Sequence, residues 1–182
     1  MKRNIIFITL ISFAISNQAK ACEVCGCSLG GYYMGILPQF NKNFIGLRWS
    51  QNKYYAYVNH QSQGTEPEYS NDTFNKIELW GRFYVSKKWQ VFAFVPFSFN
   101  HMKGNEDNVW AKGLGDITVI ANYIILNTGE QTEQKFKHTL TAGGGIKLPT
   151  GNYKQEVDGL LINPNFQLGT GSTDFLLSTI YT

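Results

Sequence analysis

The residues of this chain best suited to specific chemistry are Cys22, Cys25 and Cys27, which form a C-x-x-C-x-C cluster. Thiolates at this spacing can close around one soft metal ion such as Cu(I) or Zn(II). In an oxidising compartment, two of the three would instead pair and leave one thiol over. Lipidation of Cys22 is a third alternative, although Ala19 and the charged Lys20 do not suit it. The cluster is therefore a candidate copper or zinc site, with the disulfide and lipid alternatives open.

A second group of candidates lies on stretches in which polar and apolar residues alternate. It comprises Lys76, Glu78, Arg82, Asp116 and Asn122. Because successive side chains of a strand point to opposite faces, Lys76, Glu78 and Arg82 share one face. We expect the five to line a polar lumen, where they would set solvation and selectivity. No Ser–His–Asp or Cys–His set can be assembled, so we expect no enzyme, no catalytic residue and no cofactor apart from a metal at the cysteines.

The first 21 residues match a secretory signal peptide. Lys2 and Arg3 precede an apolar run from Ile5 to Ile15, and Ala19-Lys20-Ala21 is a small-residue cleavage site. The signal holds three of the 16 Lys and Arg and no acid, so the mature chain balances 13 basic residues (16 − 3) against 13 acidic ones. This neutral balance predicts no nucleic-acid partner. No other run is apolar over 18 residues, which excludes a multi-helix membrane protein.

The rest of the chain predicts an all-β fold. Aromatic residues are abundant, glycine is frequent and only 16% of residues are charged. Period-two alternation predicts an antiparallel meander of about six strands over residues 44–58, 75–85, 89–99, 114–126, 137–148 and from 172 onward. Gly143-Gly144-Gly145 marks a bend or a close backbone approach within the fifth of these strands.

The length of the strands and of their connections favours a transmembrane β-barrel over a soluble sandwich. Strands of about ten residues or more suit a tilted membrane-spanning strand. A tight turn at Lys87-Lys88 and a ten-residue join at 127–136 would lie on one side, with longer joins at 59–73, 100–113 and 150–171 on the other. We expect residues 22–43 to be a cysteine-rich segment on the periplasmic or lumenal side and residues 44–182 to be a partial barrel. Since single-chain barrels start at about eight strands, we also expect a C-terminally truncated copy of a longer chain, or an oligomer.

Three motifs occur in order: Gly113-Leu114-Gly115-Asp116-Ile117, then Gly143 to Gly151, then Leu168-Gly169-Thr170-Gly171-Ser172-Thr173-Asp174. Together with the Cys-Glu-x-Cys-Gly-Cys start and residues 79–84, they resemble the outer-membrane β-barrel transporter family named after a meta-pathway phenol-degradation protein, in its Bacteroidetes-type members. The resemblance covers nearly the whole mature chain. It implies a longer barrel and a channel for small hydrophobic or aromatic compounds.

These observations predict an outer-membrane channel or transporter of a Gram-negative bacterium. Its partners would be membrane lipid, a small-molecule permeant and, in the oligomeric alternative, further copies of itself. One alternative function is a secreted or periplasmic metal-binding protein that uses Cys22, Cys25 and Cys27. Another is a structural barrel whose lumen is plugged.

Overall fold

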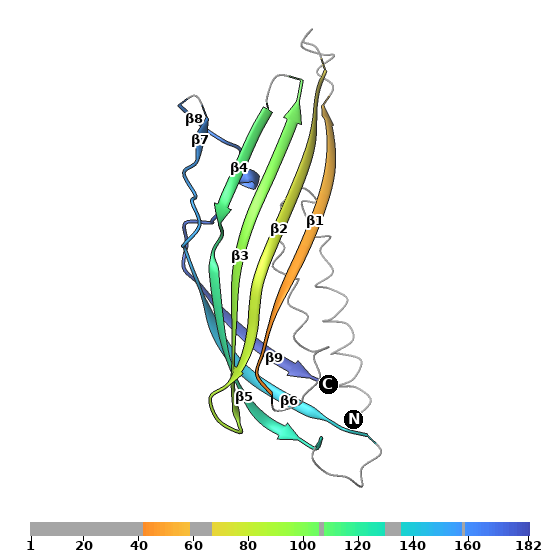
Figure 1. Ribbon diagram of the computed structural model, residues 1–182, viewed down its shortest axis with the longest axis vertical. Helices are drawn as coiled ribbons and strands as arrows, with labels where there is room; N and C mark the ends of the chain where they lie inside the picture. The colour runs from red at the N-terminus through yellow and green to blue at the C-terminus, as the bar shows by residue number, and fades with distance from the viewer. Residues whose placement is uncertain (1–41, 59–66, 106–107, 130–135, 158) are drawn as a thin grey trace, which may run out of the picture.

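The described residues form a seven-stranded antiparallel sheet, whose strands largely follow chain order (Figure 1), and a separate two-stranded sheet. The computed structural model describes residues 42–58, 67–105, 108–129, 136–157 and 159–182. The predicted signal peptide and the cysteine cluster lie outside these residues. The long strands are β1 (Phe44–Val58), β2 (Glu68–Tyr84), β3 (Trp89–Gly104), β4 (Asn108–Leu114), β5 (Ile117–Asn127), β6 (Thr139–Leu148) and β9 (Asp174–Tyr181). The prediction of an all-β antiparallel meander is confirmed.

The strand order is β1-β2-β3-β5-β6-β9, and β4 pairs with β3. The C-terminal half of β3, from Phe97 to Lys103, pairs with β4, and its N-terminal half, from Trp89 to Phe94, pairs with β5. The C-terminal end of β3 is called the upper end of the sheet, as it lies in Figure 1. Between these two strands, Gly115 donates its N–H to the carbonyl of Pro96 at 2.9 Å. The strands β4 and β5 therefore occupy a single place in the sheet, one above the other. Within the described residues, β1 and β9 are the two edges of the sheet and do not pair with each other.

Several predicted strand limits and two predicted loops are wrong. The strand predicted from residue 114 begins at Ile117, and the loop predicted at 59–73 is strand from Glu68 onward. The second strand begins at Glu68, not at residue 75, and the third runs on to Gly104. Most of the predicted loop at 100–113 is therefore strand, because β4 begins at Asn108 and pairs with the end of β3. The residues added to these strands are largely polar on both faces, so no apolar alternation marks them. Backbone hydrogen bonding along the ladder is sufficient to extend the strands there.

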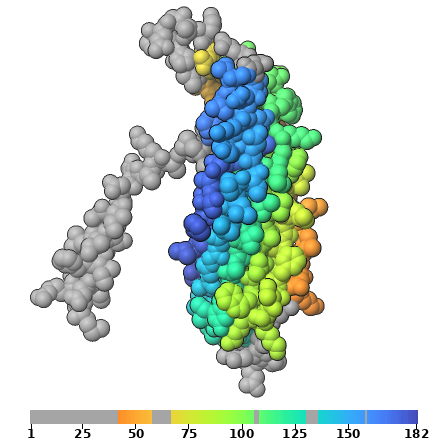
Figure 2. Space-filling model, turned by 90° about the vertical axis from the view of Figure 1, so that its left-hand side faces the viewer, coloured from red at the N-terminus to blue at the C-terminus, as the bar shows by residue number. Residues whose placement is uncertain are grey.

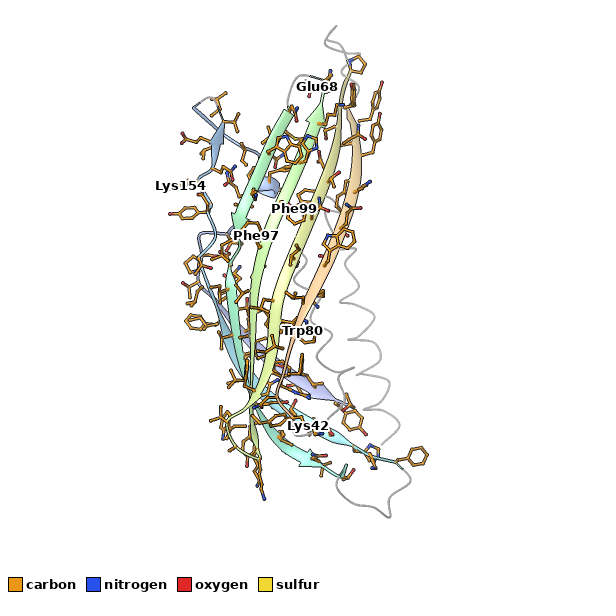
Figure 3. The ribbon with its side chains drawn as sticks, viewed as in Figure 1. Lys42, Glu68, Trp80, Phe97, Phe99 and Lys154 are labelled. Atoms are coloured by element: carbon orange, nitrogen blue, oxygen red, sulfur yellow. The ribbon has the colours of Figure 1, made fainter. Side chains whose placement is uncertain are left out.

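The two faces of the sheet differ in the kind of side chain they carry. One face carries large apolar side chains that are exposed, and we call it the outer face. On it, the side chain of Leu47 is 75% exposed and that of Leu177 is 98% exposed. On the opposite, inner face, Glu78 is 2% exposed and Asn122 is 0% exposed. The alternation can be followed in Figure 3, where Trp80 of β2 and Phe97 of β3 are labelled. Large exposed apolar side chains of the outer face are Ile45, Leu47, Trp49, Ile77, Leu79, Phe83, Trp89, Phe97, Phe175 and Leu177.

These outer residues form a band that ends partway along the strands; we call it the apolar belt. Above Trp49 and Ile77, the outer face first becomes polar, with Gln51 beside Asn75 and Lys53 beside Thr73. Further up, it exposes a separate group of aromatic side chains, Tyr55, Tyr57, Tyr69 and Trp110. Exposed apolar positions continue from Ile77 along β2 to Val85, the residue after the strand ends, which is eight residue steps or about 27 Å. At a strand tilt of about 40°, this corresponds to roughly 20 Å along the axis of a barrel.

The inner face is covered in part by the connection between β6 and β9, residues 149–173. This β6–β9 connection contains the two-residue strands β7 (Glu156–Val157) and β8 (Leu160–Leu161) and the short 3-10 helix η2 (Pro164–Phe166). Phe166, 1% exposed, packs with Ile162 against Val109 and Ala111 of β4. Figure 2 shows this connection packed along the sheet. The predicted loop at 150–171 is thus a folded part of the molecule.

Two glycines of β6 allow the sheet to bend sharply inward. A Cβ atom at Gly143 would collide with the backbone carbonyl of Ala121, and one at Gly145 would meet the carbonyl of Val119. Both positions face inward, whereas Gly144 between them faces outward. The predicted close backbone approach at Gly143–Gly145 is confirmed, since only residues without a side chain fit where β6 crosses β5 so closely.

Candidate functional site

The candidate site is a cavity of about 640 Å³ between the inner face of the sheet and the β6–β9 connection. One wall is formed by β1, β2 and β3, and the opposite wall by the connection, by Gly115 and Asp116 between β4 and β5, and by Lys147 of β6. Its lining combines charged, amide, hydroxyl and aromatic side chains. The lining includes Ser50, Asn52, Tyr54, Phe74, Lys76, Glu78, Ser98, Asn100, Asp116, Lys147, Tyr153, Asn165 and Thr170.

On the sheet wall, Glu78 forms an ion pair with Arg48. The two residues are direct neighbours across β1 and β2, so the pairing register places their side chains side by side on the inner face. Lys76 lies one inward position above Glu78 on the same strand. A buried carboxylate is tolerated only when it is paired, and Arg48 supplies that partner. This wall of the cavity therefore carries fixed charges of both signs.

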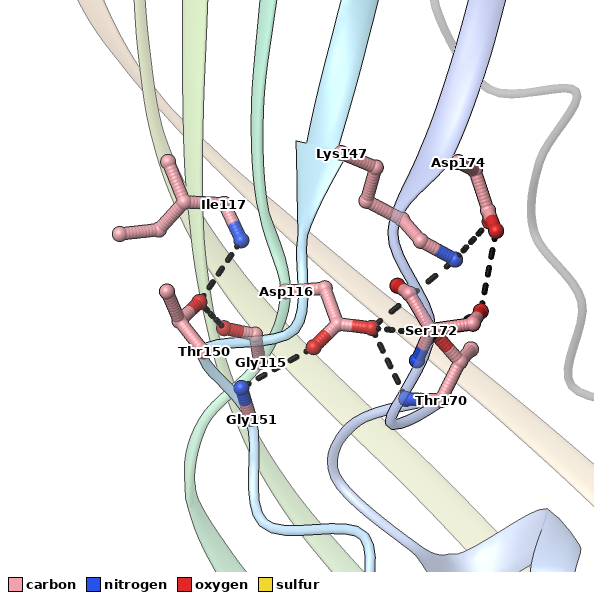
Figure 4. A network of polar contacts seen from close by, with 9 residues as sticks. All are labelled: Gly115, Asp116, Ile117, Lys147, Thr150, Gly151, Thr170, Ser172 and Asp174. Carbon is pink, nitrogen blue, oxygen red and sulfur yellow. Dashed lines mark hydrogen bonds and ion pairs between the residues drawn. The ribbon is translucent and has the colours of Figure 1, made fainter.

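On the opposite wall, Asp116 holds the β6–β9 connection against the sheet (Figure 4). Its carboxylate accepts hydrogen bonds from the Gly151 N–H at 3.0 Å and from the Thr170 N–H and hydroxyl, both at 2.8 Å. Lys147 lies 3.9 Å from Asp116 and forms an ion pair with Asp174. We call this set of contacts the Asp116 clamp. It fixes both ends of the connection, near residues 151 and 170, to one carboxylate.

The clamp explains why glycines accompany these polar residues in the sequence. A Cβ at Gly151 would approach Gly169 Cα to 2.7 Å, and one at Gly169 would come within 2.7 Å of the Asp116 carboxylate. The hydroxyl of Thr150 donates to the Gly115 carbonyl at 2.8 Å and accepts from the Ile117 N–H at 2.9 Å. Segments around residues 115, 150 and 170, far apart in the sequence, thus meet at one point. Their glycines serve close backbone packing.

Below the cavity, the inner face is filled by aromatic and aliphatic side chains. Phe92, Phe94 and Ile120 form a buried cluster, against which Trp80 packs. The Trp80 and Phe94 rings are nearly parallel, with centroids 6.1 Å apart. We call this cluster the aromatic layer. It separates the cavity from the lower end of the inner face.

The lower end carries buried polar groups. Gln90 and Asn122 are direct neighbours across β3 and β5. The Gln90 Oε1 atom and both side-chain polar atoms of Asn122 are buried and have no hydrogen-bond partner among the residues that the structure describes. Arg82 lies nearby on β2, with its guanidinium carbon 5.3 Å from the Phe44 ring centroid and 5.2 Å from that of Tyr84.

The structure brings three of the five predicted lumen residues to the cavity, namely Lys76, Glu78 and Asp116. Arg82 and Asn122 also lie on the inner face and are buried, but they sit beside or below the aromatic layer and do not border the cavity. The candidate metal ligands Cys22, Cys25 and Cys27 lie outside the described residues. Among the residues that are described, no group of three or more His, Cys, Asp or Glu side chains is placed to hold a metal ion.

Sequence reasoning missed several residues of the site. The alternating pattern places Arg48 on the polar face of its strand, as it does Glu78. Only the register of β1 against β2 shows that the two side chains meet. Thr170 and Asp174 belong to the clamp although they lie in or next to a predicted loop. Asn52 and Asn100 border the cavity. The period-two pattern of the predicted strand 44–58 already places Asn52 inward, whereas Asn100 is placed inward only once β3 is extended beyond Phe99.

Comparisons with known proteins do not identify the chain. No protein-family model, no curated protein and no solved structure matches it. No helix in the described part of the chain is long and apolar enough to cross a membrane. The features of the molecule that bear on function are therefore the two faces of the sheet and the cavity.

Proposed function

We propose that this chain forms the wall of an outer-membrane β-barrel through which small molecules diffuse. The observation that carries the proposal is the apolar belt on the exposed face combined with charged residues on the buried face. A sheet in water exposes polar residues and buries apolar ones. A barrel in lipid shows the reverse arrangement, with an apolar band about 25 Å tall facing outward and a polar interior.

The dimensions of the belt support this proposal. Its extent of roughly 20 Å along the axis, estimated above, is close to the expected height of a lipid-facing band. The belt also has polar residues beyond its upper edge, as a headgroup region requires. Trp49 and Trp89 are exposed toward the two ends of the belt, where aromatic residues are favoured at the membrane–water interface.

The inner cavity supports a passage for small molecules. Its volume of about 640 Å³ exceeds what a single ion needs and lies within the roughly 300–1,000 Å³ of small-molecule pockets. The paired charges of Arg48 with Glu78 and of Lys147 with Asp174 keep its walls polar without a strong net charge. Movement through the cavity would be passive, and the aromatic layer below it would form the narrowest part of the path.

The proposal requires that both sheet edges be paired within the membrane. Unpaired backbone N–H and C=O groups in lipid cost several kcal/mol each. The strands β1 and β9 would therefore pair with further strands or with a second copy of the chain. Export through the predicted signal peptide would deliver the chain to the outer membrane of a Gram-negative cell.

Reconstitution of the purified protein tests this function. We expect extraction from membranes to require detergent, gel mobility to shift on heating, and the protein to conduct ions in planar lipid bilayers. Glu78→Gln should shift the selectivity of the conductance toward anions, because it removes one fixed negative charge from the cavity wall. Gln51→Glu, which adds a charge to the outer face, is the matched control. Full solubility without detergent, together with no conductance, would exclude the proposal.

A further inference from the structure

The inner-face cavity contains a row of side chains that no part of the proposed pathway requires. On neighbouring strands, Asn52 of β1, Phe74 of β2 and Asn100 of β3 are direct partners in register. All three border the cavity. Since neighbouring strands lie about 4.8 Å apart, the two amides flank the aromatic ring over about 10 Å.

The hydrogen-bonding groups of this row are available to a ligand. The side chains of Asn52 and Asn100, and of Ser50 and Ser98 in the next inward row, make no hydrogen bond to the described protein. The Asn165 side chain, from η2 on the opposite wall, makes none either. Amides and hydroxyls can both donate and accept. The cavity thus presents several neutral groups that are not committed to the fold.

The charged groups of the cavity are committed. Glu78 is paired with Arg48, Lys147 with Asp174, and the Asp116 carboxylate accepts three hydrogen bonds from the β6–β9 connection. Lys76, the remaining charged residue of the lining, is not free either and interacts electrostatically with Glu78. An ionic ligand would have to compete with these partners. A neutral ligand would use the free amides and hydroxyls and leave the ion pairs intact.

The aromatic residues provide a surface for an apolar ring face. Phe74 is held by Phe166, with ring centroids 4.8 Å apart, and by Tyr54, at 5.8 Å in an edge-to-face arrangement. Tyr54 and Tyr153 also border the cavity, the latter from the opposite wall. A sugar ring has C–H groups on its faces and hydroxyls around its rim. An aromatic side chain flanked by two amides matches that distribution.

From this arrangement we infer that the cavity binds a neutral polyhydroxylated compound of mono- or disaccharide size. The inference rests on the proposed function and names its substrate class. An apolar aromatic permeant fits less well, because it would leave the amides of Asn52 and Asn100 desolvated and unpaired, which is costly. The class therefore differs from the hydrophobic or aromatic compounds that the family resemblance implies.

The test uses maltose as the probe and phenol as the aromatic comparison, applied to the full chain in planar bilayers. We expect maltose to reduce the ion current at lower concentration than phenol. The variants Asn52→Leu and Asn100→Leu should each raise the half-blocking maltose concentration about two- to tenfold, the effect of one lost hydrogen bond. Asn71→Leu, on the outer face of β2, is the matched control and should leave the block unchanged. Circular dichroism and heat-shifted mobility verify that each variant folds.

Two results would overturn the inference: block by phenol but not by maltose, or a maltose block that Asn52→Leu and Asn100→Leu leave unchanged. If the protein does not conduct ions, the proposed function fails. The binding of maltose is then tested separately, by saturation-transfer NMR on the chain folded in detergent. Saturation transfer to maltose that weakens in Asn100→Leu, but not in Asn71→Leu, supports the binding site without transport. Absence of saturation transfer to maltose rejects it.

Discussion

Replacing Leu47 with arginine distinguishes a lipid-facing belt from a surface in water. Leu47 lies in the apolar belt and is 75% exposed, so its side chain makes little contact with the rest of the protein. In water, Leu47→Arg should change the free energy of unfolding by no more than about 0.5 kcal/mol, as is usual at exposed sites. At the midplane of a bilayer, the same charge should destabilise a barrel by about 2–4 kcal/mol.

The matched control is Gln51→Arg, four residues along the same strand and on the same face. Gln51 lies above the belt, beside Asn75, so an arginine there should cost at most about 1 kcal/mol. The assay is reversible urea unfolding of the protein in phospholipid vesicles, followed by tryptophan fluorescence. The reasoning predicts a difference between the two variants of at least about 1 kcal/mol. Equal effects for Leu47→Arg and Gln51→Arg would refute the assignment of the belt to lipid.

Three further substitutions probe the inward bend and the β6–β9 connection. Gly143→Ala should destabilise by about 1–3 kcal/mol, because its Cβ meets backbone, while Gly144→Ala on the outer face should cost less; urea unfolding compares the two. Asp116→Ala should cost about 1.5–3 kcal/mol and speed amide hydrogen exchange across 150–172, whereas unchanged exchange would mean that the clamp does not hold the connection. Phe166→Ala should cost about 3–5 kcal/mol by the same unfolding assay, and a loss below about 1 kcal/mol would show that this ring is not part of the core.

The sequence predicted the parts of the fold that depend on local pattern. Alternation of Ile45, Leu47 and Trp49 placed β1 and its outer face correctly, and the limits of β1 match the prediction. The glycines from Gly143 to Gly145 indicated the bend, because glycine inside a strand commonly marks close approach. In these cases the physical cause acts within a few residues, so it is visible along the chain.

The parts that were missed depend on contacts between distant residues. Asp116 and Thr170 are 54 residues apart, and nothing near either one indicates that a carboxylate will accept hydrogen bonds from the other's backbone. The sequence does not predict strand at the beginning of β2 or at the end of β3, because their outward residues, such as Thr73 and Lys103, are polar. The row from Asn52 to Asn100 depends on register, which a strand pattern alone does not define.

The meander has a consequence for the order in which the chain can assemble. Nearly every long strand pairs with the one before it in the sequence, so most ladders close through short connections at small entropic cost. The strand β5 pairs with β3, not with β4, and the longest connection precedes β9, which can pair with β6 only after residues 149–173 have folded back. Formation of the Asp116 clamp shortens that search by joining the two ends of the connection. The carboxylate of Asp116 is therefore placed to influence how fast the last strand joins the sheet, as well as how firmly it stays there.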